Sequence, residues 1–144
     1  MYKMAVIMDP LSQINPKKDS TFAIMLEAQK RGWHVAFSTI EQVYLNQGEA
    51  CIDCHWVQLY DNESEYYKVT HSSQNVTLAD FDFTLMRKDP PFDLSYLYST
   101  IFLELAKSKG HLILNDPQAL RDINEKCYLS WFPQFCPPTL VSAQ

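Results

Sequence analysis

Residues 4–10 read Met-Ala-Val-Ile-Met-Asp-Pro, an unbroken apolar run that is stopped by an acid and a proline. Such a run is typical of a strand that is buried on both faces of a sheet. A polar loop is expected over residues 9–19, and after a helix the chain returns to strand at residues 33–39. This order of strand, helix and strand indicates an α/β fold whose crossover should be right-handed.

The helix between these strands carries recognisable start and stop signals. Asp19 or Ser20 can cap its first turn, and Gly32 follows two basic residues at its end. Its expected stripe comprises Phe22, Met25, Leu26 and Gln29. The pattern therefore predicts one amphipathic helix in the crossover position.

The middle of the chain, residues 41–76, differs from this opening. Gln47-Gly48 is a turn signal, a mixed run follows over residues 50–60, and short strands are expected at 66–69 and 75–78. We therefore predict a mostly parallel, Rossmann-like sheet with a β-hairpin excursion at about 41–76.

The α/β pattern resumes with a strand at residues 81–86, which ends in Arg87-Lys88. A helix capped by Asp93 then runs to Gly110 and has the apolar spacing of an amphipathic helix. The apolar positions are Leu94, Leu97, Tyr98, Ile101, Phe102 and Leu105.

The last part of the chain is predicted to hold a strand at 111–114, a short helix from Asp116-Pro117 and a helical stretch at about 123–131. Ligands in open α/β sheets bind beyond the carboxyl ends of the strands. The loops expected to form a site are therefore 9–19, 87–93 and 115–126.

Composition excludes several classes of function. The 144 residues are 47% hydrophobic and 20% charged, as in one soluble globular domain. A net charge of -5 argues against a nucleic-acid partner, which would require clustered Lys and Arg. No apolar run approaches the roughly 18 residues of a membrane span, and we find no export signal. We therefore expect a cytoplasmic protein whose four cysteines stay reduced.

Three kinds of site are weighed and rejected. Cys51-Ile52-Asp53-Cys54-His55 has the spacing of a haem attachment site or half a zinc site, but further ligands at suitable spacing are missing. We predict that it binds no metal or haem, and we assign no metal ligand elsewhere. The three glycines cannot form a dinucleotide or P-loop motif. A phosphorylation receiver is disfavoured because Asp80 and Asp82 begin their strand rather than end it.

The loop Arg87-Lys88-Asp89-Pro90-Pro91 suggests an anion site. Its two prolines favour an extended and restricted backbone, so Arg87 is presented from a rigid segment. An arginine side chain is suited to a bidentate grip on a carboxylate. The alternative is a structural salt bridge to a nearby aspartate.

Three strings resemble bacterial-type glutathione synthetases. The first joins Met8-Asp9-Pro10 to residues 17–32, the second spans Leu85–Asp93, and the third spans Asn115–Lys126. Their order and spacing also match, and the likeness is weakest across residues 47–76. The chain is therefore similar to the amino-terminal, pre-ATP-grasp domain of that family.

The resemblance implies a ligase that joins glycine to γ-glutamylcysteine with ATP and magnesium, through an acyl phosphate. Asp9, Arg87 and Lys88 would bind substrate, and Lys126 matches the family's first ATP-contacting lysine. No catalytic residue is assigned within this chain.

The same resemblance divides the chain into a pre-ATP-grasp domain, residues 1–122, and the start of a linker, residues 123–144, into a missing ATP-grasp domain. We expect the chain alone to be inactive and to bind neither ATP nor magnesium tightly. The family also allows a homo-oligomer. The alternative function is a free-standing binding or oligomerisation module of the same fold, without catalysis.

Overall fold

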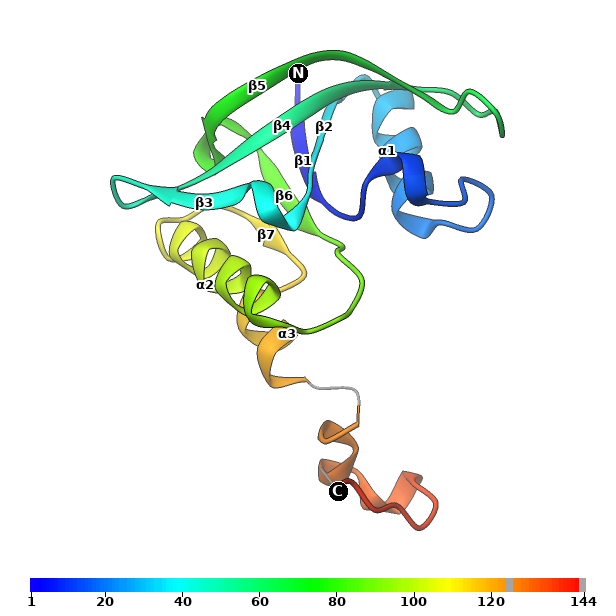
Figure 1. The fold of residues 1–144 in the computed structure, drawn as a ribbon, viewed down its shortest axis with the longest axis vertical. Coiled ribbons are helices and arrows are strands. Elements are labelled where there is room, and N and C mark those ends of the chain that lie inside the picture. Colours follow the sequence, from blue (N-terminus) through cyan, green and yellow to red (C-terminus); the bar gives the residue numbers. More distant parts are fainter. Residues whose placement is uncertain (124–125, 143–144) are drawn as a thin grey trace.

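A computed structural model describes residues 1–123 and 126–142 and shows a mixed, seven-stranded sheet with helices on both faces (Figure 1). The predicted α/β class is confirmed. The strands are β1 (Lys3–Ile7), β2 (His34–Ser38), β3 (Val43–Asn46), β4 (Glu49–Leu59), β5 (Tyr67–Thr77), β6 (Phe83–Met86) and β7 (Ile113–Leu114). The helices are α1 (Ser20–Lys30), α2 (Leu94–Ser108) and α3 (Pro117–Asp122).

The first strand is central, as its apolar run predicts. The sheet order is β3-β4-β2-β1-β6-β7, with β5 paired to β4. Strand β1 pairs in parallel with β2 and with β6, and β6 pairs in parallel with β7. By contrast, β4 pairs antiparallel with β2, β3 and β5. A parallel half and an antiparallel arm are thus parts of the same sheet.

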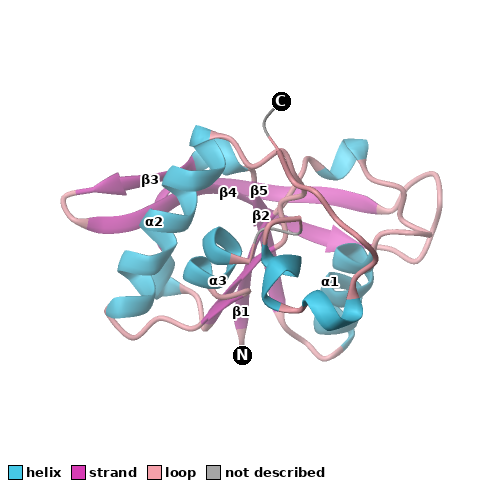
Figure 2. Cartoon of the chain, turned by 90° about the horizontal axis from the view of Figure 1, so that it is seen from below, coloured by secondary structure: helices cyan, strands magenta, loops and turns pink. Residues whose placement is uncertain are grey.

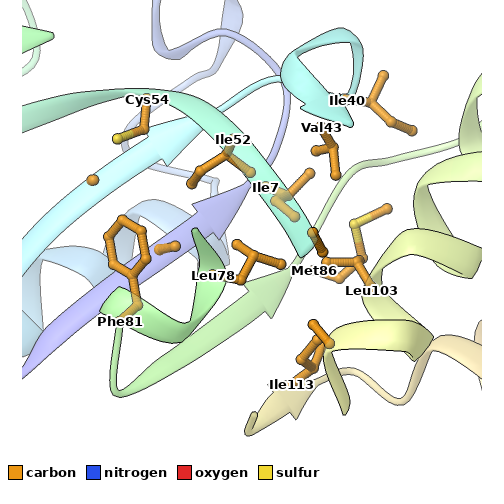
Figure 3. Packing of buried hydrophobic residues seen from close by; sticks show 14 of the residues in the cluster. Ile7, Ile40, Val43, Ile52, Cys54, Leu78, Phe81, Met86, Leu103 and Ile113 are labelled. Atoms are coloured by element: carbon orange, nitrogen blue, oxygen red, sulfur yellow. The ribbon is translucent and has the colours of Figure 1, made fainter. Parts of the chain in front are cut away.

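Successive side chains of β1 point to opposite faces of the sheet and so contribute to two hydrophobic layers, one on each face. Ala5 and Ile7 belong to the layer that includes Leu103 of α2, which Figure 3 shows from close by. Met4 and Val6 belong to the other layer, which is covered by α1. Figures 1 and 2 accordingly show α1 and α2 well apart.

Helix α1 follows its sequence signals closely. The Asp19 carboxylate accepts a hydrogen bond from the Phe22 amide at 2.8 Å and caps the helix. Phe22 and Met25 are buried against the sheet. Gln29 has a different role, because its side chain donates to the Leu59 carbonyl at 2.8 Å and accepts from the Leu59 amide at 2.7 Å. It therefore ties α1 to the end of β4.

The excursion at 41–76 is confirmed as a pair of hairpins, although one detail is wrong. Gln47 and Gly48 form the tight turn between β3 and β4, both at positive φ (50° and 81°). The two short strands expected at 66–69 and 75–78 are one strand, β5, which pairs along most of β4. Two shifts of register between β4 and β5 bend the ladder without ending it, so the alternation in the sequence is broken while the strand continues.

Helix α2 begins after its predicted cap, where Asp93 accepts a hydrogen bond from the Tyr96 amide. Only part of its apolar stripe faces the core, where Phe102 packs against the buried residues of the sheet. Leu94, Tyr98 and Ile101 are exposed by 69%, 54% and 43%. The buried face instead comprises Tyr96, Ser99, Thr100, Leu103 and Ala106.

The two buried hydroxyls of α2 explain how this face can lie inside. Ser99 Oγ donates to the Ser95 carbonyl at 2.8 Å, and Thr100 Oγ1 donates to the Leu97 carbonyl at 2.6 Å. Because both hydroxyls are hydrogen-bonded within the helix, their burial carries no large desolvation penalty. Small side chains also let α2 lie close to the sheet.

The end of the chain differs from the helix expected at about 123–131. Short 3₁₀ turns form at Tyr128–Trp131 and Pro133–Phe135, and residues 124–125 lie outside the described part of the chain. The prolines at 133, 137 and 138 limit a longer helix. No helix in the described residues has the length and apolarity needed to cross a membrane.

Candidate functional site

The candidate site lies at the carboxyl edge of the parallel half. Strand β1 leads into Asp9, and β6 leads directly into Arg87 and Lys88. The Arg87 amide donates to the Ile7 carbonyl at 2.8 Å, which continues the pairing of β1 and β6 past the end of β6. The backbone thus fixes the start of the charged loop beside the loop that follows β1.

Asp9 and Lys88, both predicted to bind substrate, form an ion pair with each other. Lys88 Nζ lies 3.1 Å from Asp9 Oδ1, and the two side chains are exposed by 15% and 34%. Lys88 Nζ also donates to the Asp89 carbonyl at 2.6 Å. The lysine is therefore held by its own loop, and the pair links the ends of two neighbouring strands.

Arg87, the third predicted substrate residue, is held by hydroxyl groups. Its Nε donates to Thr21 Oγ1 at 3.1 Å, and its Nη2 donates to Ser20 Oγ at 2.8 Å. The aspartate pair considered for this arginine is instead made by Lys88. A guanidinium group has five N–H donors, so the two hydroxyls leave donors for a further acceptor.

Ser20 and Thr21 were not among the residues predicted for the site. They occupy the first turn of α1, and Thr21 is buried while its hydroxyl faces Arg87. Hydroxyl residues are common at the start of helices, so Ser20 and Thr21 carry no distinct sequence signal for this contact. The signal that could find them is their position directly after the 9–19 loop, which is one of the three loops expected to form a site.

Two hollows adjoin these side chains. A cavity of about 320 Å³ is lined by Asp9, Gln13, Ser20, Thr21 and Arg87, among others. A second cavity of about 340 Å³ shares Asp9 and Gln13, and adds Lys88. The Asp9–Lys88 pair therefore lies beside a polar recess in which Arg87 forms one wall.

A larger cavity of about 600 Å³ lies further along the same edge, beyond β6 and β7. Its walls include Phe92, Tyr96, Asn115 and Arg121. Burial, and to a lesser extent the charge of Asp89, raise the pKa of the Tyr96 phenol. Two of the three predicted loops, 87–93 and 115–126, thus meet at this cavity, while 9–19 and 87–93 meet at the smaller ones.

Lys126, predicted to contact nucleotide phosphate, lies past α3. It is exposed and does not line these three cavities. The structure therefore does not bring it together with Arg87, and its contact to ATP stays a prediction.

The Cys51, Cys54 and His55 motif lies on β4 in the antiparallel arm. Burial raises the pKa of both thiols, that of Cys54 to about 11, which disfavours a thiolate ligand. His55 Nδ1 lies 2.7 Å from Ser72 Oγ. Among residues 1–123 and 126–142, no group of three or more His, Cys, Asp or Glu side chains could hold a metal ion. The absence of metal and haem binding remains a prediction.

The chain is similar to known proteins along nearly its whole length. Residues 2–121 match a family described as the N-terminal domain of prokaryotic glutathione synthetase. The chain is 49% identical over 142 residues to the glutathione synthetase of Vibrio vulnificus strain CMCP6, covering 99% of this chain and 44% of that protein. It is 46% identical to the glutathione synthetase of Escherichia coli O6:H1, with 99% and 45% coverage. The chain thus spans less than half the length of these relatives.

Proposed function

Since the chain belongs to the family of prokaryotic glutathione synthetase N-terminal domains, we propose that it is the substrate-binding part of a carboxylate–amine ligase. The complete enzyme would join glycine to γ-glutamylcysteine with ATP, through an acyl phosphate. The observation that carries this proposal is Arg87, held by Ser20 and Thr21 at the carboxyl edge of the sheet. The cytoplasmic location expected from the sequence belongs to the same proposal.

The proposed role of Arg87 is to hold a substrate carboxylate. Two donors of the guanidinium are fixed by hydroxyls that carry no charge. Its positive charge therefore stays available to a carboxylate, for which a charge-assisted, bidentate hydrogen bond is the strongest arrangement. Orientation before the substrate arrives reduces the entropy lost on binding.

Asp9 and Lys88 are proposed to contact the polar groups of the same substrate from the other side of the recess. γ-Glutamylcysteine carries an ammonium group and two carboxylates, so it can approach both members of an ion pair. The partial exposure of Asp9 leaves an oxygen accessible for an ammonium group. Lys88 would then face a carboxylate, in keeping with its position beside Arg87.

The proposed activity requires ATP and magnesium, but we assign few of the residues that bind them to this chain. The described residues include no acidic cluster that fits magnesium, so we assign the metal to residues outside this chain. Lys126 is proposed to reach a nucleotide phosphate in the complete enzyme. An acyl phosphate must be protected from water by an enclosing site, and we therefore expect no glutathione synthesis by these residues alone.

Calorimetric titration tests the proposal. γ-Glutamylcysteine and ATP are titrated into this chain and into a joined protein, in which the chain is continued by the part of the Vibrio vulnificus synthetase that follows the matched region. We expect weak or unmeasurable heats for the chain, and binding with glycine-dependent turnover for the joined protein. Turnover by the chain alone would contradict the proposal that it binds substrate but needs the rest of the enzyme for synthesis. A folded joined protein without affinity for γ-glutamylcysteine would overturn the substrate.

The alternative function, a free-standing assembly module, has one observation in its favour, which is the exposed apolar side of α2. It differs from the ligase proposal in predicting no turnover for the joined protein. The same assay therefore separates the two.

A further inference from the structure

The connection between β4 and β5, residues 60–66, lies beside α1 and the 9–19 loop (Figures 1 and 2). The Tyr66 hydroxyl donates to the Leu11 carbonyl at 2.5 Å, although the two residues are 55 positions apart. The Tyr66 ring also meets Phe22 of α1 edge to face, with ring centroids 5.6 Å apart. The antiparallel arm thus contacts both segments that supply walls of the polar recess around Arg87.

Leu11 is placed to transmit this contact to the recess. Its side chain is fully buried in the hydrophobic layer under α1, on which Tyr66 also packs. Pro10 lies between Asp9 and Leu11, and its ring fixes φ, here at -53°. The Gln13 amide donates to the Pro10 carbonyl at 2.8 Å and closes a turn. Few freely rotating backbone bonds therefore separate the Leu11 carbonyl from Asp9 and Gln13.

Asp9 and Gln13 form the wall of the recess that this turn controls, since both line each of the two smaller cavities. The opposite wall is fixed by other means. The Arg87 amide extends the pairing of β1 with β6, and the Arg87 side chain is held by the first turn of α1. The Leu11 carbonyl is the point at which the arm holds the first wall.

We propose that Tyr66 is a positioning residue of the substrate site: its hydroxyl holds the Leu11 carbonyl and thereby sets the positions of Asp9 and Gln13. This role rests on the proposed function, in which γ-glutamylcysteine occupies the recess. Burial, and to a lesser extent the neighbouring Tyr67, raise the pKa of the Tyr66 phenol above its ordinary 10, so it remains a donor at neutral pH. Because Tyr66 acts through the loop, its loss should affect substrate affinity more than the chemical step.

An ion pair also joins the arm to this loop. Lys17 Nζ lies 2.5 Å from Glu63 Oε1, and the two side chains are exposed by 63% and 68%. An exposed ion pair contributes little, because water and salt screen it and two long side chains must be ordered. We therefore assign the positioning to the Tyr66 hydroxyl, and Glu63→Gln tests that choice.

The first test measures the kinetics of the joined protein. Tyr66→Phe keeps the ring on Phe22 and removes only the donor, so we expect KM for γ-glutamylcysteine to rise about fivefold. The kcat value and the KM values for ATP and glycine should stay nearly unchanged. Tyr67→Phe is the matched control, because within the described part of the chain the Tyr67 oxygen bonds to no residue of the 9–19 loop. Tyr67→Phe and Glu63→Gln should each change KM by less than about twofold.

The second test uses the chain itself and does not depend on activity. The Gln13 amide, which closes the turn after Pro10, should exchange with deuterium faster in Tyr66→Phe than in Tyr67→Phe, by up to about fivefold. The Thr84 amide donates to the Leu112 carbonyl elsewhere in the sheet and should exchange equally in both variants. Equal exchange of the Gln13 amide in the two variants would overturn the positioning role.

The kinetic outcomes separate the role of Tyr66 from the proposed function. If the unsubstituted joined protein folds without affinity for γ-glutamylcysteine, the proposed function fails and the substrate role of Tyr66 fails with it. If that protein binds γ-glutamylcysteine while Tyr66→Phe and Tyr67→Phe share one KM, only the role of Tyr66 is wrong. Equal increases of KM for all three substrates in Tyr66→Phe would indicate a general loss of structure and would also overturn the role.

Discussion

The parallel half of the sheet and its antiparallel arm bury similar side chains, but the carboxyl ends of their strands are arranged differently. Strands β1, β2, β6 and β7 run in one direction, so their carboxyl ends meet at one edge and bring Asp9, Arg87 and Lys88 together. In the arm, β3, β4 and β5 alternate in direction, so their carboxyl ends lie at opposite edges. The candidate site therefore follows from strand direction, whereas the core is common to both regions.

The largest expected effects test whether that core is shared. Ile7 on β1 and Ile52 on β4 are both fully buried in the same hydrophobic layer. Ile7→Ala and Ile52→Ala should each lower the free energy of unfolding by about 2–5 kcal/mol, measured by denaturant titration of the chain. If Ile52→Ala costs less than about 1 kcal/mol while Ile7→Ala is severe, the arm is an appendage and the comparison fails.

Arg87→Lys should affect substrate use but leave stability nearly unchanged. The substitution keeps the charge and removes the planar donor fork, so kcat/KM of the joined protein for γ-glutamylcysteine should fall by an equivalent of about 1–3 kcal/mol. Lys68→Arg on exposed β5 is the control and should change neither quantity. Unchanged kinetics for Arg87→Lys, in a protein of normal stability, would assign Arg87 a structural role.

Thr21→Val tests whether Thr21 orients Arg87 for substrate, and its effect should be smaller than that of Arg87→Lys. Valine keeps the buried shape of Thr21 but removes the oxygen that accepts from Arg87 Nε. We expect KM for γ-glutamylcysteine to rise by an equivalent of about 1 kcal/mol, with kcat less affected, and Thr21→Ser to restore it. An equal loss in Thr21→Val and Thr21→Ser would point to packing instead of orientation.

The smallest effect concerns pH. Burial lowers the pKa of His111 below its ordinary 6.5, and its Nε2 lies 2.9 Å from buried Thr84 Oγ1. As the pH falls, His111 is therefore protonated in the unfolded chain before it is protonated in the folded chain. Neutral His111 stabilises the folded chain fully above pH 6.5, and this contribution to the free energy of unfolding is lost as the pH falls through the lowered pKa of the folded state.

His111→Gln should flatten that dependence in denaturant midpoints between about pH 5 and pH 7. The control, His71→Gln on exposed β5, should retain it. An unchanged slope in His111→Gln would place the dependence on other groups.

Local signals in the sequence predict α1 well but mistake the orientation of α2. For α1, the cap at Asp19 and the burial of Phe22 and Met25 agree, because a single apolar face leaves one way to pack. For α2, periodicity identifies the most apolar side, but the hydroxyls of Ser99 and Thr100 bond within the helix and can be buried. When two faces of a helix can be buried, tertiary packing decides which one faces the core. The periodicity of the sequence carries no information on that packing.

In the candidate site, too, some features follow from local sequence signals and others depend on tertiary packing. Arg87, Lys88 and Asp9 could be proposed because unusual charges follow strand ends, and the structure does place them together. Which cation pairs with Asp9 depends on side-chain reach across two loops, and the sequence left that choice open. The contacts of Arg87 with Ser20 and Thr21 join residues far apart in the chain through common residue types, so no local pattern marks them.

The contact between Gln29 and Leu59 has a consequence for hydrogen exchange. The side-chain amide of Gln29 bonds both the N–H and the C=O of Leu59, as a neighbouring strand would. The Leu59 amide proton is therefore protected by a helix 30 residues earlier in the chain. Its exchange with deuterium should follow the undocking of α1, even while the hairpin of β4 and β5 stays intact.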